Sequence, residues 1–453
     1  MEHVNIKAAR DALRENNEIM TRVGSGTPMG DALRRFWMPA LLSSELNSDG
    51  SPVRLCMLGE DLTAFRDTEG NVGIVDAYCA HKRAPLFFGR NENGGLRCAY
   101  HGWKFDVGGN CLDIPNIVLP DNYEALCKRM KIRAYETAEA GGVVWVYMGP
   151  KEKRPKLPRM EWMDLPPEYV HVSRWFQRSN WLQGMEGELD SSHISFLHSS
   201  TDMEDTLSRG AAMANDTRPL IAVKETDYGL YYGSRRRHED QYYWRISHWM
   251  LPMWSAVPPT PGFYFGQGRG WSPINDYMTT TFAYRYRIDR PLNEEDMKEI
   301  NTGVSFPPVM ERGTVEMSNG FVIDTWLPTA NKGNDYQIDR EVQRTKSFTG
   351  IYGINTQDRG LQESMGGIHG DQPGIVDRAL EHLVSSDRPV VAARRRLVTI
   401  ATDLRKGIDP DALNKPESYF VRGVAKLSSI ADFEEFVEAN SEELKAKPLD
   451  AKT

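Results

Sequence analysis

The feature that most constrains this chain is a pair of short motifs in which a cysteine and a histidine lie close together. Cys79-Ala-His81 is followed sixteen residues later by Cys98-Ala-Tyr-His101. Each motif supplies one thiol and one imidazole. Five cysteines in 453 residues do not make the disulfide framework of a small secreted domain. We therefore predict that these four residues bind metal.

The order of the four ligands favours an iron–sulfur centre over zinc. In a Rieske [2Fe–2S] cluster two thiolates bind one iron and two imidazoles bind the other, so each loop can supply one ligand of each kind. Zinc sites usually pair their ligands as C-x2–4-C or H-x3–5-H, and C-x-H is tight for one ion. The other cysteines lack such partners and are predicted to be small core residues: Cys56, Cys111 and Cys127.

A second candidate metal site lies in the middle of the chain. Asp190, His193 and His198 form the pattern D-x2-H-x4-H in a segment, about 186–198, that is predicted to be helical. Side chains five residues apart on an ideal helix point about 140° apart, so both histidines can reach one ion only where the helix bends or widens into a π-bulge. Ferrous oxygenases use two histidines and one carboxylate, whereas zinc proteases show H-E-x-x-H. Alone, the pair could be helix-surface residues; the upstream motif favours metal binding.

Together these motifs resemble those of the aromatic-ring-hydroxylating Rieske oxygenases, specifically the terminal oxygenase subunits of the phthalate dioxygenase-like branch. The resemblance covers nearly the whole chain and rests on the following stretches: Gly26–Pro39, the two cysteine–histidine motifs with Gly102-Trp103, Asn180–His198, Gln357-Asp358 and Asp377–Asp387. It implies that Asp358 is the third ligand of a mononuclear ferrous iron, with Glu363 and Asp371 as rivals. His369 and His382 are expected not to bind metal.

The resemblance also implies how the parts work. The chain would activate O2 at the ferrous iron, with electrons from the Rieske cluster, and hydroxylate an aromatic, carboxylate-bearing substrate. The predicted catalytic residues are Asp190 and Asn180; Asp190 would join His101 of one chain to His193 of the next in a homotrimer, or in a hexamer of two trimers. The glycines at 24–30 lack the G-x-G-x-x-G spacing of a nicotinamide site. A separate NAD(P)H-dependent reductase is therefore expected.

Two other functions stay open. A monooxygenase that hydroxylates a methoxy carbon, and so demethylates a methoxylated aromatic acid, would carry the same motifs. A Rieske electron carrier would hold about two irons per chain, whereas an oxygenase would hold about three. His193, His198 and Asp358 count against the carrier.

A predicted strand, residues 242–253, supplies the main candidate for substrate binding. Alternation places four residues on one of its faces: Tyr243, Arg245, Ser247 and Trp249. The Arg245 guanidinium could hold a carboxylate through two parallel hydrogen bonds. The resemblance adds Ser179 and Arg209, with Arg218 as a further candidate. Several apolar residues could form the pocket wall, although core packing explains them equally well: Met250, Pro252, Trp254 and Phe263–Phe265.

The chain is predicted to have an α+β fold in three parts. Residues 1–37 form a helical segment broken at the glycines of 24–30, residues 38–155 an all-β Rieske domain, and residues 156–453 a helix-grip-like catalytic domain with an antiparallel sheet. Short apolar runs between Gly, Asn and Asp turns predict the first domain, and long runs at 230–237 and 242–253 predict strands of the second. Asp387 is predicted to cap a helix that ends near Lys406, before Gly407.

Charge and hydropathy exclude two classes of partner. A net charge of −8 and a pI near 5.8 do not provide the basic face that nucleic acids require. The longest apolar runs, such as Val143–Met148, fall far short of the roughly 20 residues that span a bilayer, and the charged N-terminal segment lacks the apolar core of a secretory signal. We expect a cytoplasmic enzyme that binds neither nucleic acid nor membrane.

Overall fold

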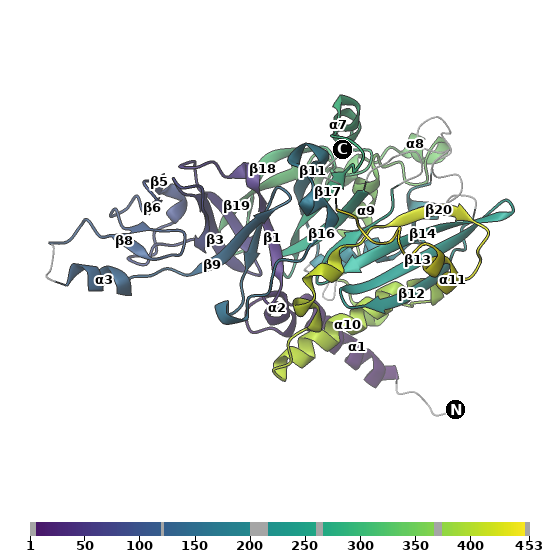
Figure 1. The fold of residues 1–453 in the computed structure, drawn as a ribbon, viewed down its shortest axis with the longest axis horizontal. Coiled ribbons are helices and arrows are strands. Elements are labelled where there is room, and N and C mark those ends of the chain that lie inside the picture. Colours follow the sequence, from purple (N-terminus) through teal and green to yellow (C-terminus); the bar gives the residue numbers. More distant parts are fainter. Residues whose placement is uncertain (1–5, 119–121, 200–215, 260–265, 367–373, 449–453) are drawn as a thin grey trace.

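Two helices separated by a glycine-rich turn begin the chain, as the sequence predicts. The computed structural model describes residues 6–118, 122–199, 216–259, 266–366 and 374–448. α1 (Ile6–Thr21) is followed by α2 (Pro28–Leu33), whose N-cap Thr27 accepts a hydrogen bond from the backbone N–H of Gly30. Both helices pack against α10 (Arg388–Arg405), which lies beside them at the bottom of Figure 1.

The first domain is built on a six-stranded antiparallel sheet. Its strands lie in the order β1-β10-β9-β4-β3-β2. β10 is buried along its whole length, which explains its unbroken apolar sequence. Four strands predicted here, at 54–57, 62–65, 73–75 and 142–147, correspond to β2 (Val53–Met57), β3 (Glu60–Arg66), β4 (Val72–Asp76) and β10 (Val143–Tyr147), the last one residue shorter than predicted. The sheet also contains β1 (Trp37–Leu42) and β9 (Ala134–Ala140).

A second, smaller sheet extends this domain away from the rest of the molecule. Its four short strands pair in sequence order and form, with α3 (Tyr123–Arg129), the far left end of Figure 1. The strands are β5 (Arg90–Glu92), β6 (Gly95–Arg97), β7 (Lys104–Phe105) and β8 (Cys111–Asp113). The two cysteine–histidine motifs lie in loops, one between β4 and β5 and the other between β6 and β7.

The second domain contains a large antiparallel sheet. Its strands follow the order β11-β17-β16-β15-β14-β13-β12, and β20 pairs with β14. The strand predicted at 230–237 lies within β13, and the one predicted at 242–253 forms β14 but ends at Met250, where a turn follows. β13 and β14 pair from Gly229 opposite Met250 to His238 opposite Gln241. The bounds are β11 (Val170–Gln177), β12 (Leu220–Thr226), β13 (Gly229–His238), β14 (Gln241–Met250), β15 (Trp254–Ala256), β16 (Gly266–Asn275), β17 (Met278–Tyr286) and β20 (Val424–Ser428).

Helices lie against this sheet and beyond it. Two of them, α4 and α9, pack on each other, and α4 also lies against β16. The remaining α-helices of the described residues are α4 (Trp181–Leu189), α5 (Ile194–Leu197), α7 (Glu294–Asn301), α8 (Arg340–Thr345), α9 (Ile354–Gln362) and α11 (Phe433–Ala439). A hairpin of β18 (Met310–Glu316) and β19 (Val322–Pro328) packs on β2 and β11 and so joins the two domains. None of the described helices is long and apolar enough to cross a membrane.

Ten 3-10 turns complete the elements of the described residues. They are η1 (Ser43–Glu45), η2 (Leu86–Phe88), η3 (Lys151–Lys153), η4 (Glu161–Asp164), η5 (Pro167–Tyr169), η6 (Lys332–Gln337), η7 (Arg378–Leu380), η8 (Ser385–Asp387), η9 (Asp411–Asn414) and η10 (Pro416–Tyr419).

Helix α10 begins and ends as predicted, with one difference. Gly407 has a φ of +84°, the left-handed conformation that ends helices at glycine. Asp387 occupies the N-cap position but makes no side-chain capping bond to α10. Its carboxylate instead accepts a hydrogen bond from Val384 N at 2.7 Å, and so closes the preceding turn.

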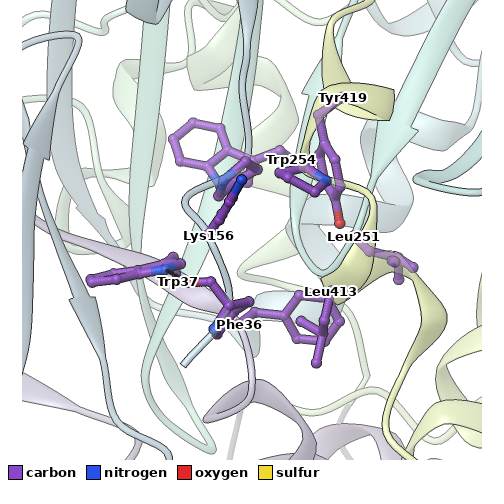
Figure 2. A pocket seen from close by; sticks show the side chains of 11 residues that line it. Phe36, Trp37, Lys156, Leu251, Trp254, Leu413 and Tyr419 are labelled. Atoms are coloured by element: carbon purple, nitrogen blue, oxygen red, sulfur yellow. Dashed lines mark hydrogen bonds between the residues drawn. The ribbon is translucent and has the colours of Figure 1, made fainter. Parts of the chain in front are cut away.

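The two domains share one hydrophobic core. Trp145 of β10 lies 5.3 Å, between ring centroids, from Trp254 of β15, and Trp254 also contacts Trp162 and Tyr284. Trp254 and Met250 are therefore core residues. A small apolar pocket at this junction, lined by Phe36, Trp37, Leu251, Trp254 and Tyr419 among others, lies beside the chain segment that contains the predicted boundary at residue 155 (Figure 2).

Candidate functional site

The two cysteine–histidine loops meet at the end of the first domain. Cys79 and Cys98 are 1% and 3% exposed, and the His81 and His101 rings lie 4.5 Å apart between centroids. Backbone hydrogen bonds hold each loop: Cys79 N–H donates to Ala84 O, and Cys98 N–H donates to Trp103 O at 2.7 Å. Two thiols and two imidazoles thus converge on one place.

These four side chains fit the ligand set of a [2Fe–2S] cluster. Burial raises the pKa of the Cys79 thiol to about 11 and the neighbouring Cys98 thiol adds to the effect, so the two sulfurs face each other. The His81 ring stacks on Trp103 with an interplanar angle of 2°, and no described residue bonds its buried Nδ1. Thiols on one side and imidazoles on the other match two irons with unlike ligands. The three other cysteines are buried, as predicted.

His193, His198 and Asp358 form a second cluster. His193 Nε2 lies 3.1 Å from His198 Nε2, and Asp358 Oδ1 lies 3.2 Å from His198 Nε2 and 3.7 Å from His193 Nε2. Among the described residues this is the group whose ligand atoms, all within 4.8 Å of one another, could hold a metal ion. The structure therefore brings together the three residues that the sequence predicted as metal ligands.

The local structure around the histidines differs from the predicted bent helix. α4 ends at Leu189, and a separate four-residue helix, α5, has His193 as its N-cap and His198 as its C-cap. The break follows from Asp190, whose carboxylate accepts hydrogen bonds from Ser192 N at 2.7 Å and Ser192 Oγ at 2.6 Å. Such an aspartate turn competes with the helix, so the Asp-Ser-Ser sequence could have predicted it.

The orientation of His198 is set by Gln357, a residue to which the sequence assigned no role. Gln357 Nε2 donates to Ile351 O at 2.8 Å, which fixes the amide so that Oε1 points to His198 Nδ1 at 2.7 Å. Nδ1 of His198 therefore carries a proton, and Nε2 is the ring atom directed toward Asp358 and His193. Gln357 comes directly before Asp358 on α9.

Asp190 lies beside His193. Asp190 Oδ2 is 3.7 Å from His193 Nδ1, on the ring edge away from His198. Burial opposes ionisation of Asp190, yet the neighbouring His193 and the hydrogen bonds from Ser192 lower its pKa to about 2. An ionised carboxylate on the far nitrogen is the arrangement that orients metal-binding imidazoles.

Arg269 donates to the other oxygen of Asp358 and is itself paired with Glu188. No sequence pattern predicted a role for these two residues. Arg269 Nη1 donates to Asp358 Oδ2 at 3.1 Å, and Arg269 Nη2 donates to Glu188 Oε2. Burial would raise the pKa of Asp358, but His198 and Arg269 hold it well below its usual range. No spacing in the sequence links positions 188, 269 and 358, because they lie on α4, β16 and α9.

One rival metal ligand, Glu363, is bonded to other residues. Glu363 accepts hydrogen bonds from Arg178 N at 3.1 Å and Tyr336 Oη at 2.7 Å, so both of its oxygens are already bonded. His382 is exposed. Asp371 and His369 lie outside the described residues.

Arg245 lies on a sheet face that is directed toward the histidines. On β13 and β14, Arg245 stands opposite Ser234, two positions from the Tyr232–Ser247 pair. Side chains of this face hold the chain that leads to His193: Tyr232 Oη donates to Glu188 O at 2.5 Å and Arg236 Nη2 donates to Ser191 O at 2.6 Å.

Arg245 brings a buried donor to this face. No described residue accepts a hydrogen bond from its buried Nη1. The register places Arg236 on the same face, diagonal to Arg245, and burial together with the charge of Arg245 lowers the pKa of Arg236 to about 10. Positive charge therefore gathers on this face.

The structure also describes three further predicted site residues: Asn180, Ser179 and Arg218. Asn180 is the N-cap of α4, at the end opposite Asp190, where its side chain bonds Leu182 N, Thr21 O and Asp276 O. Ser179 Oγ accepts a hydrogen bond from Gln177 inside the core. Arg218 precedes β12, where its N–H donates to Asp216. Arg209 and Phe263–Phe265 lie outside the described residues.

Family models match both domains. A Rieske [2Fe-2S] domain matches residues 36–124, and a model described as LigXa C-terminal domain like matches residues 146–431. The structure of dicamba monooxygenase bound to dicamba aligns with a TM-score of 0.55 over 83% of this chain and 99% of that chain, at 16% identity. The expected fold is confirmed: an all-β Rieske domain followed by an α+β domain with a large antiparallel sheet.

Curated relatives match along most of the chain. The 3-chlorobenzoate-3,4-dioxygenase oxygenase subunit of Comamonas testosteroni is 37% identical over 90% of this chain and 93% of its own. The phthalate 4,5-dioxygenase oxygenase subunit of Pseudomonas putida is 35% identical over 87% of each chain. The 5,5'-dehydrodivanillate O-demethylase oxygenase subunit of a Sphingobium species is 29% identical over 88% of this chain and 82% of its own.

Proposed function

This chain belongs to the aromatic-ring-hydroxylating Rieske oxygenases, close to the oxygenase subunits of 3-chlorobenzoate and phthalate dioxygenases, and we propose that it is a terminal oxygenase that hydroxylates an aromatic carboxylate at a mononuclear ferrous iron. It is the oxygenase subunit of a multicomponent system and receives electrons from a ferredoxin or reductase. The observation that carries the substrate class is the buried Nη1 of Arg245, which finds no acceptor among the described residues and lies on the face directed toward the histidines.

Two metal groups are assigned to the two clusters. Cys79, Cys98, His81 and His101 would hold the Rieske cluster, and His193, His198 and Asp358 the ferrous iron. When bound, the iron supplies positions at which O2 and substrate react, since three protein ligands leave others open. Gln357 holds the proton of His198 on Nδ1 so that Nε2 is free to bind metal, and the Asp190 carboxylate lies 3.7 Å from Nδ1 of His193.

The carboxylate of the substrate would pair with Arg245. A guanidinium binds a carboxylate through parallel N–H···O bonds, and burial strengthens the pairing. Arg236, already bonded to Ser191 O, adds positive charge to the same face. The carboxylate would anchor one edge of the ring and present another edge toward His193 and His198.

Electrons would pass between chains of a homotrimer. The cluster loops belong to the domain that forms the left part of Figure 1, whereas α9, which carries Asp358, lies in the other domain. Exposed aromatic side chains lie near both sites: Phe88 and Tyr100 at the cluster, Phe196, Phe348 and Tyr352 near the histidines. Contact between these surfaces would bring one chain's cluster to the next chain's iron, with Asp190 between them. A separate NAD(P)H-dependent reductase would recharge the cluster.

O-demethylation of a methoxylated aromatic acid is the second candidate, because a relative 29% identical to this chain is an O-demethylase subunit. Both candidates use the same metal sites and the same carboxylate anchor. A pure electron carrier would have no use for the cluster of His193, His198 and Asp358.

The first experiment counts metal and sulfide. Anaerobically purified protein is expected to hold about three irons and two acid-labile sulfides per chain. His193→Ala should lose about one iron and keep the Rieske spectrum, and the exposed His382→Ala should match wild type. About two irons in all three proteins would contradict the oxygenase assignment.

A product assay then separates the candidates. With reductase, NADH and O2, benzoates bearing chloro, carboxyl or methoxy groups are compared with their carboxamides. Carboxylates should be consumed and carboxamides spared. A cis-diol product indicates dioxygenation, whereas released formaldehyde indicates demethylation. Equal turnover of acids and amides would contradict the role of Arg245.

A further inference from the structure

The two oxygens of the Asp358 carboxylate have unlike surroundings. Oδ1 faces the two histidines, 3.2 Å from His198 Nε2. Oδ2 points the other way and accepts a hydrogen bond from Arg269 Nη1 at 3.1 Å. Asp358 is 4% exposed and Arg269 9%, so this ion pair has little competition from water.

Arg269 is itself held by a second carboxylate. Its Nη2 donates to Glu188 Oε2, while Glu188 Oε1 accepts from Ser255 Oγ at 2.9 Å. The Arg269 guanidinium also lies 5.3 Å from the centroid of the Phe306 ring. A planar guanidinium fixed at one nitrogen by Glu188 presents the other at a set angle, as a flexible ammonium group would not.

Resting on the proposed ferrous site, we propose that Arg269, oriented by Glu188, is a positioning residue that occupies Oδ2 of Asp358 and leaves only Oδ1 for the metal. An aspartate can bind a metal through one oxygen or both. The bond from Arg269 makes the second oxygen unavailable, and one more position on the metal stays open for O2 or substrate.

The same chain of contacts connects the elements that carry the ligands. Glu188 lies at the end of α4, two residues before Asp190 and the turn into His193; Arg269 lies on β16; Asp358 lies on α9. Glu188 and Asp358 bring two negative charges and Arg269 one positive charge. Removing Arg269 would therefore increase the negative charge around the metal and free a second oxygen donor.

This charge balance separates positioning from simple support of the fold. If Arg269 only supported the fold, Arg269→Gln would bind iron less tightly. If it occupies Oδ2, Arg269→Gln should keep its mononuclear iron against a ferrous chelator at least as long as wild type. Its metal geometry should nevertheless change, because Oδ2 can now bind.

The geometry is measured by EPR of the ferrous–nitric oxide adduct, to which the diamagnetic oxidised cluster contributes no signal. Arg269→Gln should give an altered line shape, and Arg269→Lys, which can keep a charge on Oδ2, one closer to wild type. Glu188→Gln removes a negative charge while Arg269 remains, so iron release should be faster by roughly threefold to tenfold. Iron content and the thermal midpoint are measured on every variant.

Arg285→Gln is the matched control. Arg285 is a buried arginine on the neighbouring strand β17, paired with Glu299 and 5.8 Å from the same Phe306 ring. It should keep the wild-type line shape and iron release. Loss of iron from Arg269→Gln would overturn the proposal, and so would an unchanged line shape with the iron retained. If Arg269→Gln does not fold, a wild-type rate of iron release from Glu188→Gln would overturn it. Wild-type protein without mononuclear iron would instead overturn the proposed function.

Discussion

Single buried residues of the second domain show how charge is used in this chain. Most of its buried arginines have partners: Arg269 pairs with Glu188 and Asp358, and Arg378 with Glu186. Arg245 differs, because no described residue bonds its Nη1. A buried cationic donor without an acceptor destabilises a protein, and such groups gather where a ligand supplies the partner.

Arg245→Met should therefore separate stability from binding. We expect the KM for an aromatic carboxylate to rise roughly 100-fold, because a charge-assisted pair is lost. The free energy of unfolding should stay the same or increase, because the variant removes an unpaired buried donor. KM and urea unfolding measure the two effects.

Arg235→Met is the control for this prediction. Arg235 lies on β13 with its side chain on the opposite face, stacked on Tyr242 4.5 Å from the ring centroid. The KM of Arg235→Met should match that of wild type. A wild-type KM in Arg245→Met would instead show that Arg245 does not bind the substrate.

At the scale of elements, α4 brings its functional residues to its C-terminal end, while Asn180 caps its N-terminal end. All three side-chain hydrogen bonds of Asn180 go to backbone groups, those of Leu182, Thr21 and Asp276. The cap thereby ties α4 to the end of α1 and to the turn between β16 and β17. These contacts give the fully buried Asn180 a structural explanation that its predicted catalytic role does not require.

Asn180→Ala should consequently lower the free energy of unfolding but have little effect on kcat. Losing the cap and leaving buried backbone groups unpaired should cost about 3 kcal/mol of unfolding free energy. Mononuclear iron content and kcat at low temperature should remain near wild type. Denaturant unfolding, iron analysis and turnover measure this.

Asn293→Ala is the matched comparison, because Asn293 caps the more exposed helix α7 through one bond from Asp296 N. Asn293→Ala should lower the free energy of unfolding by about 1 kcal/mol. A stable Asn180→Ala with strongly reduced kcat would favour the catalytic role that the sequence predicted.

At the scale of the whole molecule, one chain holds its two candidate metal sites in different domains. The cluster loops belong to the domain on the left of Figure 1, and the histidines of α5 lie with Asp358 of α9 in the other domain. The proposed trimer makes each active site from two chains, so variants defective in different sites should complement each other.

Co-expression tests this assembly. Cys98→Ala removes a cluster ligand and His193→Ala an iron ligand, and each alone should be inactive. In randomly mixed trimers about a quarter of the chains would have an intact iron beside a neighbour's intact cluster, so about a quarter of wild-type activity should return. No recovery in mixed trimers, shown by differently tagged chains, would indicate transfer within one chain.

The sequence alone determined the parts of the sites whose members are close along the chain. Cys79 and His81, Cys98 and His101, and His193 and His198 are ligands from single loops or turns, where spacing limits what the side chains can reach. The alternation that placed Arg245 on one face, and the runs that predicted β13 and β14, are likewise patterns among residues close along the chain. Asp358 required a resemblance, because about 160 residues separate it from His198.

Only the tertiary structure decided how these parts are held. Glu188, Arg269 and Asp358 meet because α4, β16 and α9 pack together, and no local pattern encodes that contact. The aspartate turn at Asp190 replaced the predicted helix distortion with a break, because side-chain hydrogen bonds to the backbone compete with the helix. Local spacing thus determines which ligands are available, whereas long-range packing determines the orientation of each ligand and the charges around it.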